Sequence, residues 1–162
     1  MIILGIDPGS RICGYGLLEV KKHKILAAGC GTIKNKEKES LSERLLVVYN
    51  GLKKIIEEYK PDVAAVENIF YGKNIQSSFT LGHVRGVVLL LLAQYAIPCY
   101  EYSPREIKQS VVGSGSASKK QIVYMVQNIL QLKTQTITYD AADGLAAAIC
   151  LFNKEKYNLF HK

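Results

Sequence analysis

The chain has only four cysteines, and no two of them form a C-x-x-C pair. They are spread along the sequence at Cys13, Cys30, Cys99 and Cys150. Scattered single cysteines argue against a zinc site, and they also argue against the disulfide framework of a small secreted protein. We therefore expect reduced cysteines, most of them buried.

Long apolar runs and linkers are also missing. The longest strongly apolar stretch, 87–93, is far shorter than the roughly 18 residues that span a bilayer, and no charged leader precedes the apolar run at the N-terminus. The 162 residues contain no Pro-, Gly- or Ser-rich linker and no internal repeat. We predict a cytoplasmic protein without a membrane partner, with a single domain over 1–153 and a short C-terminal tail over 154–162.

Acidic residues are the minority charge. Lysine and arginine number 21 against 14 aspartates and glutamates, which gives a formal net charge of +7 and an isoelectric point near 9.2. A basic chain favours a polyanionic partner such as nucleic acid, although many basic proteins bind none. The positions of the few carboxylates are therefore informative.

Four carboxylates lie at the ends of predicted core elements. Asp7 and Glu67 each directly follow an apolar run, and so each ends a buried strand. Asp140 and Asp143 are three residues apart, which places them on one face of a helix near its positive end. Carboxylates gathered in this way repel one another and shift in pKa unless a cation joins them, and hard oxygen ligands suit Mg²⁺ or Mn²⁺.

Each carboxylate also has an ordinary explanation. Asp7 fits the Asx turn that ends a strand, and the two helical aspartates fit a helix cap plus a surface acid. Glu67 needs a partner at a buried strand end, which Lys73 or Arg85 would supply. The set as a whole favours chemistry, because strand ends at one edge of a sheet converge with a neighbouring helix N-terminus. Paired Mg²⁺ ions held by such acids support phosphodiester hydrolysis.

Hydrophobic periodicity predicts an α/β protein with a mixed sheet and helices on both faces. Three strands over 2–7, 14–20 and 25–33 are joined by short turns, which implies antiparallel neighbours. An amphipathic helix then leads to a parallel strand over 62–67. The remaining predicted elements are a helix over 75–95, a strand over 97–102, two helices with capping boxes that begin at Ser103 and Ser118, and a last helix that begins near Asp140.

The predicted helix over 75–95 is apolar on every side at 87–92. A helix of this kind must be covered all round, by its own sheet and by a further surface. A second copy of the chain related by a two-fold axis would supply that surface. We therefore expect a homodimer.

Four motifs follow one another along the chain. They are Ile6-Asp7-Pro8-Gly9-Ser10-Arg11 with Gly14-Tyr15-Gly16, Val66-Glu67-Asn68-Ile69-Phe70 with Lys73-Asn74, the run 108–115 with Ala117 and Lys119, and Asp140-Ala141-Ala142-Asp143. In this order they resemble the RuvC family of Holliday junction resolvases over essentially the whole chain.

The resemblance implies an RNase H-like fold, a five-stranded mixed sheet with three antiparallel strands followed by parallel strands. It implies a homodimeric endonuclease that resolves four-way (Holliday) DNA junctions by paired symmetric nicks, in homologous recombination and DNA repair. Two Mg²⁺ ions per active site are implied, for which Mn²⁺ can substitute, and the products carry 5′-phosphate and 3′-hydroxyl ends. A branch-migration motor complex is a further partner by family analogy.

The resemblance also assigns roles to residues. It makes metal-binding catalytic residues of Asp7, Glu67, Asp140 and Asp143. It places Lys108 and Lys119 beside the scissile phosphate, as catalytic residues that also contact DNA, although both also fit ordinary solvated lysines. Gly144 departs from the family pattern, where a better helix former such as alanine is usual, and costs about 1 kcal/mol of helix propensity.

The DNA-contacting residues implied by the resemblance are mostly basic. Phe70 is the exception, since it would stack on an unpaired base at the junction centre, a contact worth about 1 to 3 kcal/mol. It also fits an aromatic that tucks back into the core. The candidate contacts to the DNA backbone are Arg11, Lys73, Arg85 and Arg105.

Two other classes of protein stay open. The segment 7–10 with Gly14 and Gly16 also resembles the phosphate-binding hairpin of actin-like ATPases and sugar kinases, but those enzymes close two such domains over a nucleotide and no second hairpin is found. A DNA-binding module without catalysis would keep the basic surface. The presence of all four acids speaks against that module.

Overall fold

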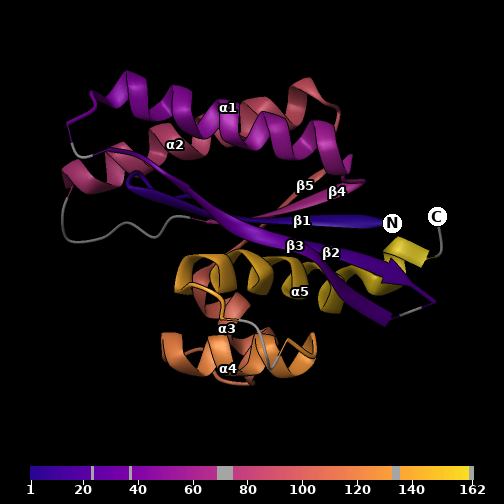
Figure 1. The fold of residues 1–162 in the computed structure, drawn as a ribbon. Coiled ribbons are helices and arrows are strands. Elements are labelled where there is room, and N and C mark those ends of the chain that lie inside the picture. The colour runs from indigo at the N-terminus through magenta and orange to yellow at the C-terminus, as the bar shows by residue number, and fades with distance from the viewer. Residues whose placement is uncertain (23, 37, 69–74, 133–135, 161–162) are drawn as a thin grey trace.

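A mixed five-stranded sheet in the order β3-β2-β1-β4-β5 runs through the centre of the chain (Figure 1). The computed structural model describes residues 1–160 apart from 23, 37, 69–74 and 133–135. β1, β2 and β3 are antiparallel neighbours, whereas β4 is parallel to β1 and β5 is parallel to β4. The predicted sheet is confirmed. Its strands are β1 (Ile2–Asp7), β2 (Ile12–Lys21), β3 (Lys24–Lys34), β4 (Val63–Glu67) and β5 (Cys99–Tyr102).

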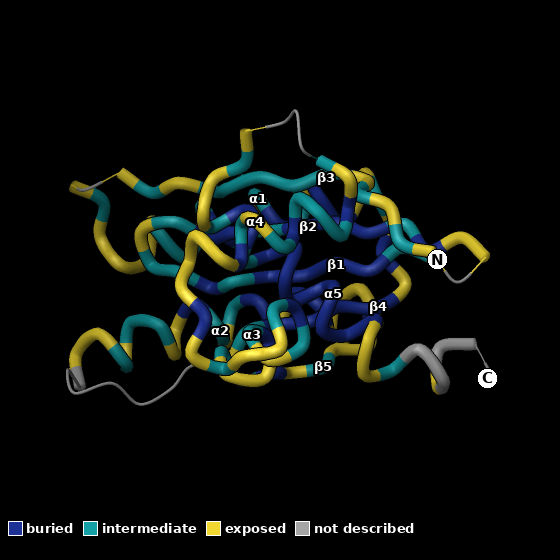
Figure 2. Tube along the Cα trace, turned by 90° about the horizontal axis from the view of Figure 1, so that it is seen from below, coloured by how far each residue is buried: buried dark blue, intermediate teal, exposed yellow. Residues whose placement is uncertain are grey.

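Helices cover both faces of this sheet, as the sequence predicts. Two of them, α1 and α2, lie on one face, while α5 lies against the other with α3 and α4 beyond it (Figure 1). Buried residues concentrate in the central strands and in α5 (Figure 2). The helices are α1 (Leu41–Tyr59), α2 (Ile75–Gln94), α3 (Pro104–Val112), α4 (Lys119–Ile129) and α5 (Tyr139–Phe160).

Alternation along β1 divides the core into two clusters. Ile3 packs on the α5 side of the sheet, whereas Leu4 and Ile6 pack on the side of α1 and α2. Because side chains alternate between the faces of a strand, Asp7 continues the series that faces α5. Asp7, the last residue of β1, therefore lies on the face of the sheet that α5 covers.

Local capping sets the helix starts near this end of the molecule. Ser103 and Ser118 both form the predicted capping boxes, in which the cap side chain accepts from the N–H of Glu106 or Gln121 and the partner side chain accepts from the cap N–H. Each box satisfies two backbone N–H groups that the helix leaves unpaired. The first residue of α4 is consequently held in place.

Several predicted boundaries differ from the structure; β2, for example, begins at Ile12 instead of at 14, and β4 begins at Val63 instead of at 62. β5 begins at Cys99 instead of at 97, because the N–H of Ile97 donates to the carbonyl of Leu92 and so still closes the end of α2. α5 continues through Phe160, into the segment predicted as a tail. The four cysteines are free thiols. Cys13 and Cys150 are buried, Cys30 is half-buried and Cys99, on an edge strand, is exposed.

α2 has one buried face and one exposed face. Val84, Val88, Leu91 and Leu92 are buried against the sheet and α1, whereas Leu90 keeps 58% of its surface exposed. Within the described residues, the stretch Gln76–Gln94 is the one helix long and apolar enough to cross a membrane, with a mean hydropathy of 1.2. Core helices of soluble proteins, which are mostly buried, meet the same criterion, whereas 22% of this stretch is buried. Its buried residues pack against the sheet and α1.

Candidate active site

Two of the carboxylates end neighbouring strands at the same level. Ile6 of β1 pairs with Val66 of β4, so Asp7 and Glu67 follow directly at matching positions. Adjacent strands lie about 4.8 Å apart, and paired positions present their side chains to the same face of the sheet. Both carboxylates therefore emerge on the face that α5 covers.

The start of α5 rests directly on the backbone of β2. Gly14, which pairs with Asp7 across the sheet, lies so close to α5 that a Cβ there would stand 1.9 Å from the carbonyl oxygen of Asp140. No side chain fits between strand and helix at this point. The first turn of α5, with Asp140 and Asp143, is thereby held beside Asp7.

Gly144 belongs to the same close contact. A Cβ at this position would lie 2.5 Å from the backbone carbon of Tyr15 in β2. The sequence indicates only a loss of helix propensity here, but the structure gives the glycine a positive role. It lets the helix approach the strand at the level of the acidic residues.

The carboxylates lie close enough to perturb one another. Burial raises the pKa of Asp7 to about 7, and the charges of Asp143 and Asp140 add to this, although Lys119 opposes it. Burial likewise raises the pKa of Glu67 to about 8, helped by Asp7 and Asp143. Near neutral pH these side chains accordingly hold protons that ordinary carboxyl groups have lost, which is the behaviour of an acidic cluster without a counter-ion.

Two lysines reach the acidic cluster. Lys119, the first residue of α4, places its Nζ 3.3 Å from a carboxylate oxygen of Asp143. Partial burial acts to lower the pKa of Lys119, but the charges of Asp143, Asp140 and Asp7 together raise it. The pKa of Asp143 is nevertheless raised, because its burial outweighs the lysine. Lys108 of α3 is half-buried, and its charge acts to lower the pKa of Glu67 and Asp143.

The donor set fits a hard divalent cation. All four acids offer carboxylate oxygens, the ligands that Mg²⁺ and Mn²⁺ prefer, and the raised pKa values of Asp7 and Glu67 mark a place where positive charge is favoured. Among the described residues no three carboxylate, imidazole or thiol groups are already drawn together tightly enough to form a metal cluster. The carboxylate of Asp143 forms an ion pair with Lys119.

The remaining predicted residues lie in different environments. Arg11 is exposed in the turn between β1 and β2. Arg85 of α2 forms an ion pair with Glu101 of β5, with its Nε 2.7 Å from the carboxylate, so its guanidinium is already engaged. Arg105 is exposed on α3, away from the acids. The predicted contacts Phe70 and Lys73 lie outside the described residues.

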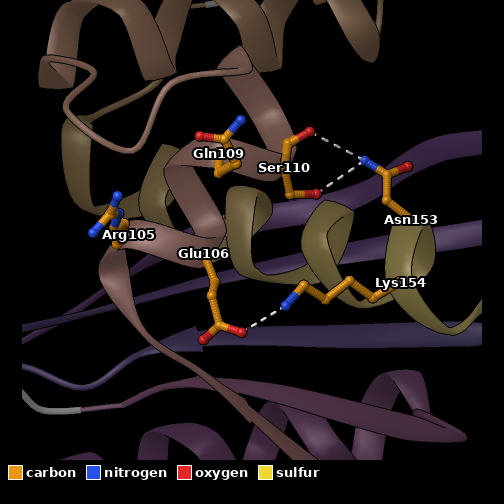
Figure 3. Close-up of a pocket in the computed structure, with 6 residues that line it drawn as sticks. All are labelled: Arg105, Glu106, Gln109, Ser110, Asn153 and Lys154. Atoms are coloured by element: carbon orange, nitrogen blue, oxygen red, sulfur yellow. Dashed lines mark hydrogen bonds and ion pairs between the residues drawn. The ribbon is translucent and has the colours of Figure 1, made fainter.

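Arg105 lines a hollow of about 420 Å³ between α3 and α5 (Figure 3). Its other lining groups are largely satisfied, since Lys154 contacts the Glu106 carboxylate at 2.6 Å and the Asn153 side chain donates to the hydroxyl of Ser110 at 3.1 Å. None of the four acids lines it. The acidic cluster lies instead at the C-terminal ends of β1 and β4 and at the N-terminal end of α5.

No motif in the sequence marks Asn35, yet the structure places it against the turn that follows Asp7. It directly follows β3 and donates two hydrogen bonds to the turn that carries Arg11. The only signal along the chain is a polar residue just after a strand, which is too common to be informative. The role of Asn35 becomes visible only from its hydrogen bonds to the carbonyls of Ser10 and Arg11 in the folded structure.

Comparison with known proteins bears on this arrangement. The sequence profile of the family "Crossover junction endodeoxyribonuclease RuvC" matches residues 3–151. The proteins of that name from Pseudothermotoga lettingae and Chloroflexus aggregans are 45% and 47% identical over 150 residues, which are 93% of this chain and 93% and 92% of theirs. The structure of RuvC from T. thermophilus in complex with a Holliday junction substrate superimposes with a TM-score of 0.89 at 28% identity, over 98% of this chain and 96% of that one. The RNase H-like fold expected from the sequence is thereby confirmed. The chain belongs to the RuvC family of crossover junction endodeoxyribonucleases.

Proposed function

We propose that this protein is a structure-selective endonuclease that resolves four-way DNA junctions during homologous recombination and DNA repair in the cytoplasm. The observation that carries the proposal is the convergence of four carboxylates at the ends of β1, β4 and α5, in a chain with a net charge of +7. The similarity to a RuvC solved with a Holliday junction substrate supports four-way DNA as the partner.

Asp7, Glu67, Asp140 and Asp143 would hold two Mg²⁺ ions, or Mn²⁺ in their place. Ions held there would supply the activation of water and the charge stabilisation that phosphodiester hydrolysis needs, and the expected products carry 5′-phosphate and 3′-hydroxyl ends. The protein's own contribution is the close backbone contact between α5 and Gly14, which holds the first turn of the helix beside Asp7. Rigid placement of reacting groups accounts for a large share of catalysis.

Lys119 and Lys108 are the cationic groups of the site. Lys119 is bound to Asp143 and 62% of its side chain is exposed, so its ammonium group can meet an incoming phosphate from the solvent side. A fixed positive charge there stabilises the negative charge that develops on the phosphate in the transition state. Lys108 approaches the cluster from α3 and adds to the same effect.

A homodimer would give the paired symmetric nicks. The exposed face of α2 carries Phe79 and Leu90 at 66% and 58% exposure, and Gly82 and Gly86 have open space in front of them. Apolar side chains beside uncovered glycines suit close packing against a second copy about a two-fold axis. Two sites in one dimer would match a symmetric junction.

Further contacts complete the proposed DNA-binding surface. Phe70 would stack on an unpaired base, and Arg11, Lys73 and Arg105 would bind the backbone. Arg85 would have to leave Glu101 first, so we expect the weakest contribution from it. A branch-migration motor would act on the same junction as a separate partner.

A nicking assay tests the proposal. A four-way junction labelled in turn on each strand should be cut at symmetric positions in the presence of Mg²⁺, while a linear duplex of the same sequence stays intact. Asp7→Asn serves as the inactive control. Binding of the junction without any Mg²⁺-dependent cutting would favour the non-catalytic module, and stabilisation by nucleotides would favour the ATPase class.

A further inference from the structure

Asn35 clamps the turn that leaves the active site between β1 and β2. The last ladder pair between β2 and β3 joins Ile12 to Lys34. One residue further on, the Asn35 N–H donates to the carbonyl of Arg11 at 2.9 Å, and its side-chain Nδ2 donates to the carbonyl of Ser10 at 2.8 Å. Two consecutive carbonyls of the turn are thus held by one residue, which directly follows β3.

The clamped turn has little freedom of its own. A Cβ at Gly9 would lie 1.9 Å from the carbonyl oxygen of Ile12, so the chain folds tightly back on itself immediately after Asp7 and Pro8. Since both ends of the turn belong to strands, Asn35 fixes its middle. Asn35 therefore holds the backbone of the turn at Ser10 and at Arg11.

Stability alone does not explain an asparagine at this position. Its Oδ1 is buried and, within the described part of the chain, has no hydrogen-bond donor. A buried acceptor left unpaired costs about 1 to 3 kcal/mol. The Asn35 side chain bears this cost in free energy and still holds the turn, so its role is better explained by the function of the turn than by stability.

Arg11 is the group that the turn presents. It is exposed, and no carboxylate of the described residues forms an ion pair with it, in contrast to Arg85. It lies four positions after Asp7, on the connection that starts at the acidic cluster. A phosphodiester next to the scissile one would find this guanidinium unoccupied.

We infer that Asn35 is a positioning residue, which orients the Ser10–Arg11 turn so that Arg11 binds a backbone phosphate of the DNA strand beside the acidic cluster. The inference rests on the proposed function for its ligand, DNA. It assigns to Asn35 no contact with the reacting atoms. Its effect passes through Arg11, and this makes the two residues energetically dependent on each other.

A double-mutant cycle on DNA binding tests this dependence. Binding of a four-way junction and of a linear duplex is measured over a series of KCl concentrations without divalent cations, for the wild type, Arg11→Ala, Asn35→Ala and the double variant. Loss of one phosphate contact lowers the slope of log K against log salt by about 0.9. We expect that loss for Arg11→Ala, about half of it or more for Asn35→Ala, and no further loss in the double variant.

Asn128→Ala is the matched control, because the Asn128 side chain also donates to a backbone carbonyl at 2.8 Å, within α4. It should leave the slope unchanged. Should Asn35→Ala fold poorly, Asn35→Ser replaces it, with a polar side chain too short to reach Ser10.

The inference is overturned if Arg11→Ala keeps the wild-type slope, if Asn35→Ala and Asn35→Ser do so, or if the losses add in the double variant. The proposed function fails separately, when wild-type protein binds DNA but does not cut junctions with Mg²⁺. The cycle still decides the role of Asn35 in that case, since it uses binding alone.

Discussion

Replacing Gly14 by alanine should displace the acid-bearing turn of α5. The added Cβ would stand 1.9 Å from the Asp140 carbonyl oxygen, where real contacts essentially never fall below 3.0 Å, so strand and helix must separate by about 1.1 Å. The three nearest atoms that the Cβ would meet all belong to the backbone of Asp140, so no flexible side chain can give way. Overpacking of this kind costs about 1 to 3 kcal/mol of stability.

The larger expected effect is on catalysis. A shift of about 1 Å in reacting groups can cost roughly 100-fold in rate, or about 2.7 kcal/mol of barrier. We expect the single-turnover junction-cleavage rate of Gly14→Ala to fall by about that factor at saturating protein and Mg²⁺, with junction affinity nearly unchanged. Urea denaturation on the same samples separates this effect from unfolding.

Gly29→Ala is the matched control for this experiment. Gly29 is also a strand glycine of the same sheet, but a Cβ there would lie 3.4 Å from the hydroxyl of Tyr59, close to ordinary contact. It should cut junctions at close to the wild-type rate. Wild-type cleavage by Gly14→Ala, or an equal loss in both variants, would refute the claim that close backbone contact positions the acids.

Three more predictions concern the charges of the site. Asp7→Asn should abolish nicking yet keep junction binding, since removal of negative charge does not weaken attraction to DNA; near wild-type cutting would exclude Asp7 as a ligand. Lys119→Ala should slow single-turnover cleavage about tenfold, which corresponds to roughly 1.4 kcal/mol of activation barrier. The neighbouring substitution Lys120→Ala should leave the rate unchanged. If saturating protein restores the full cleavage rate of Lys119→Ala, Lys119 contributes to affinity alone. Folding raises the pKa of Asp7 from 3.8 to about 7 and that of Glu67 from 4.5 to about 8. The stability that comes from their protonation is therefore complete below their unfolded-state pKa values and is lost as pH rises through their folded-state pKa values. The increase in Tm that Mg²⁺ gives over EDTA should therefore be larger at pH about 8.5 than at about 6, and an equal increase at both would contradict the site.

Features encoded within a short stretch of sequence could be predicted. The capping boxes at Ser103 and Ser118 need only four consecutive residues, and the strand that ends in Asp7 follows from its apolar run. The order of strands follows from short turns and a helical crossover. For the same reason the convergence of β1, β4 and α5 could be inferred before any coordinates.

Contacts between distant elements could not be predicted in this way. The sequence offers Arg85 as a partner for Glu67 or as a DNA contact, whereas in the structure it pairs with Glu101 of β5. Asn35 has no distinguishing signal in the sequence, and its role becomes visible only when Ser10 lies across from it. Gly144 shows the same limit, since helix propensity describes a helix alone and carries no information about the strand beneath it. Pairing of this kind depends on register and packing, which single-sequence periodicity does not determine.

Two electrostatic effects oppose each other at the site, because the net positive charge of the chain favours ionised carboxylates and local burial disfavours them. A chain with a net charge of +7 should stabilise ionised carboxylates, yet Asp7 and Glu67 titrate above their ordinary range because they are buried and face other acids. Lys119 and Lys108 relieve only part of this repulsion. The fold thus holds the acids where ionisation is unfavourable until positive charge arrives. A basic chain and a cluster of buried acids can coexist, because at 0.1 M ionic strength salt largely screens exposed charges that lie more than about 10 Å apart, whereas buried charges are screened much less.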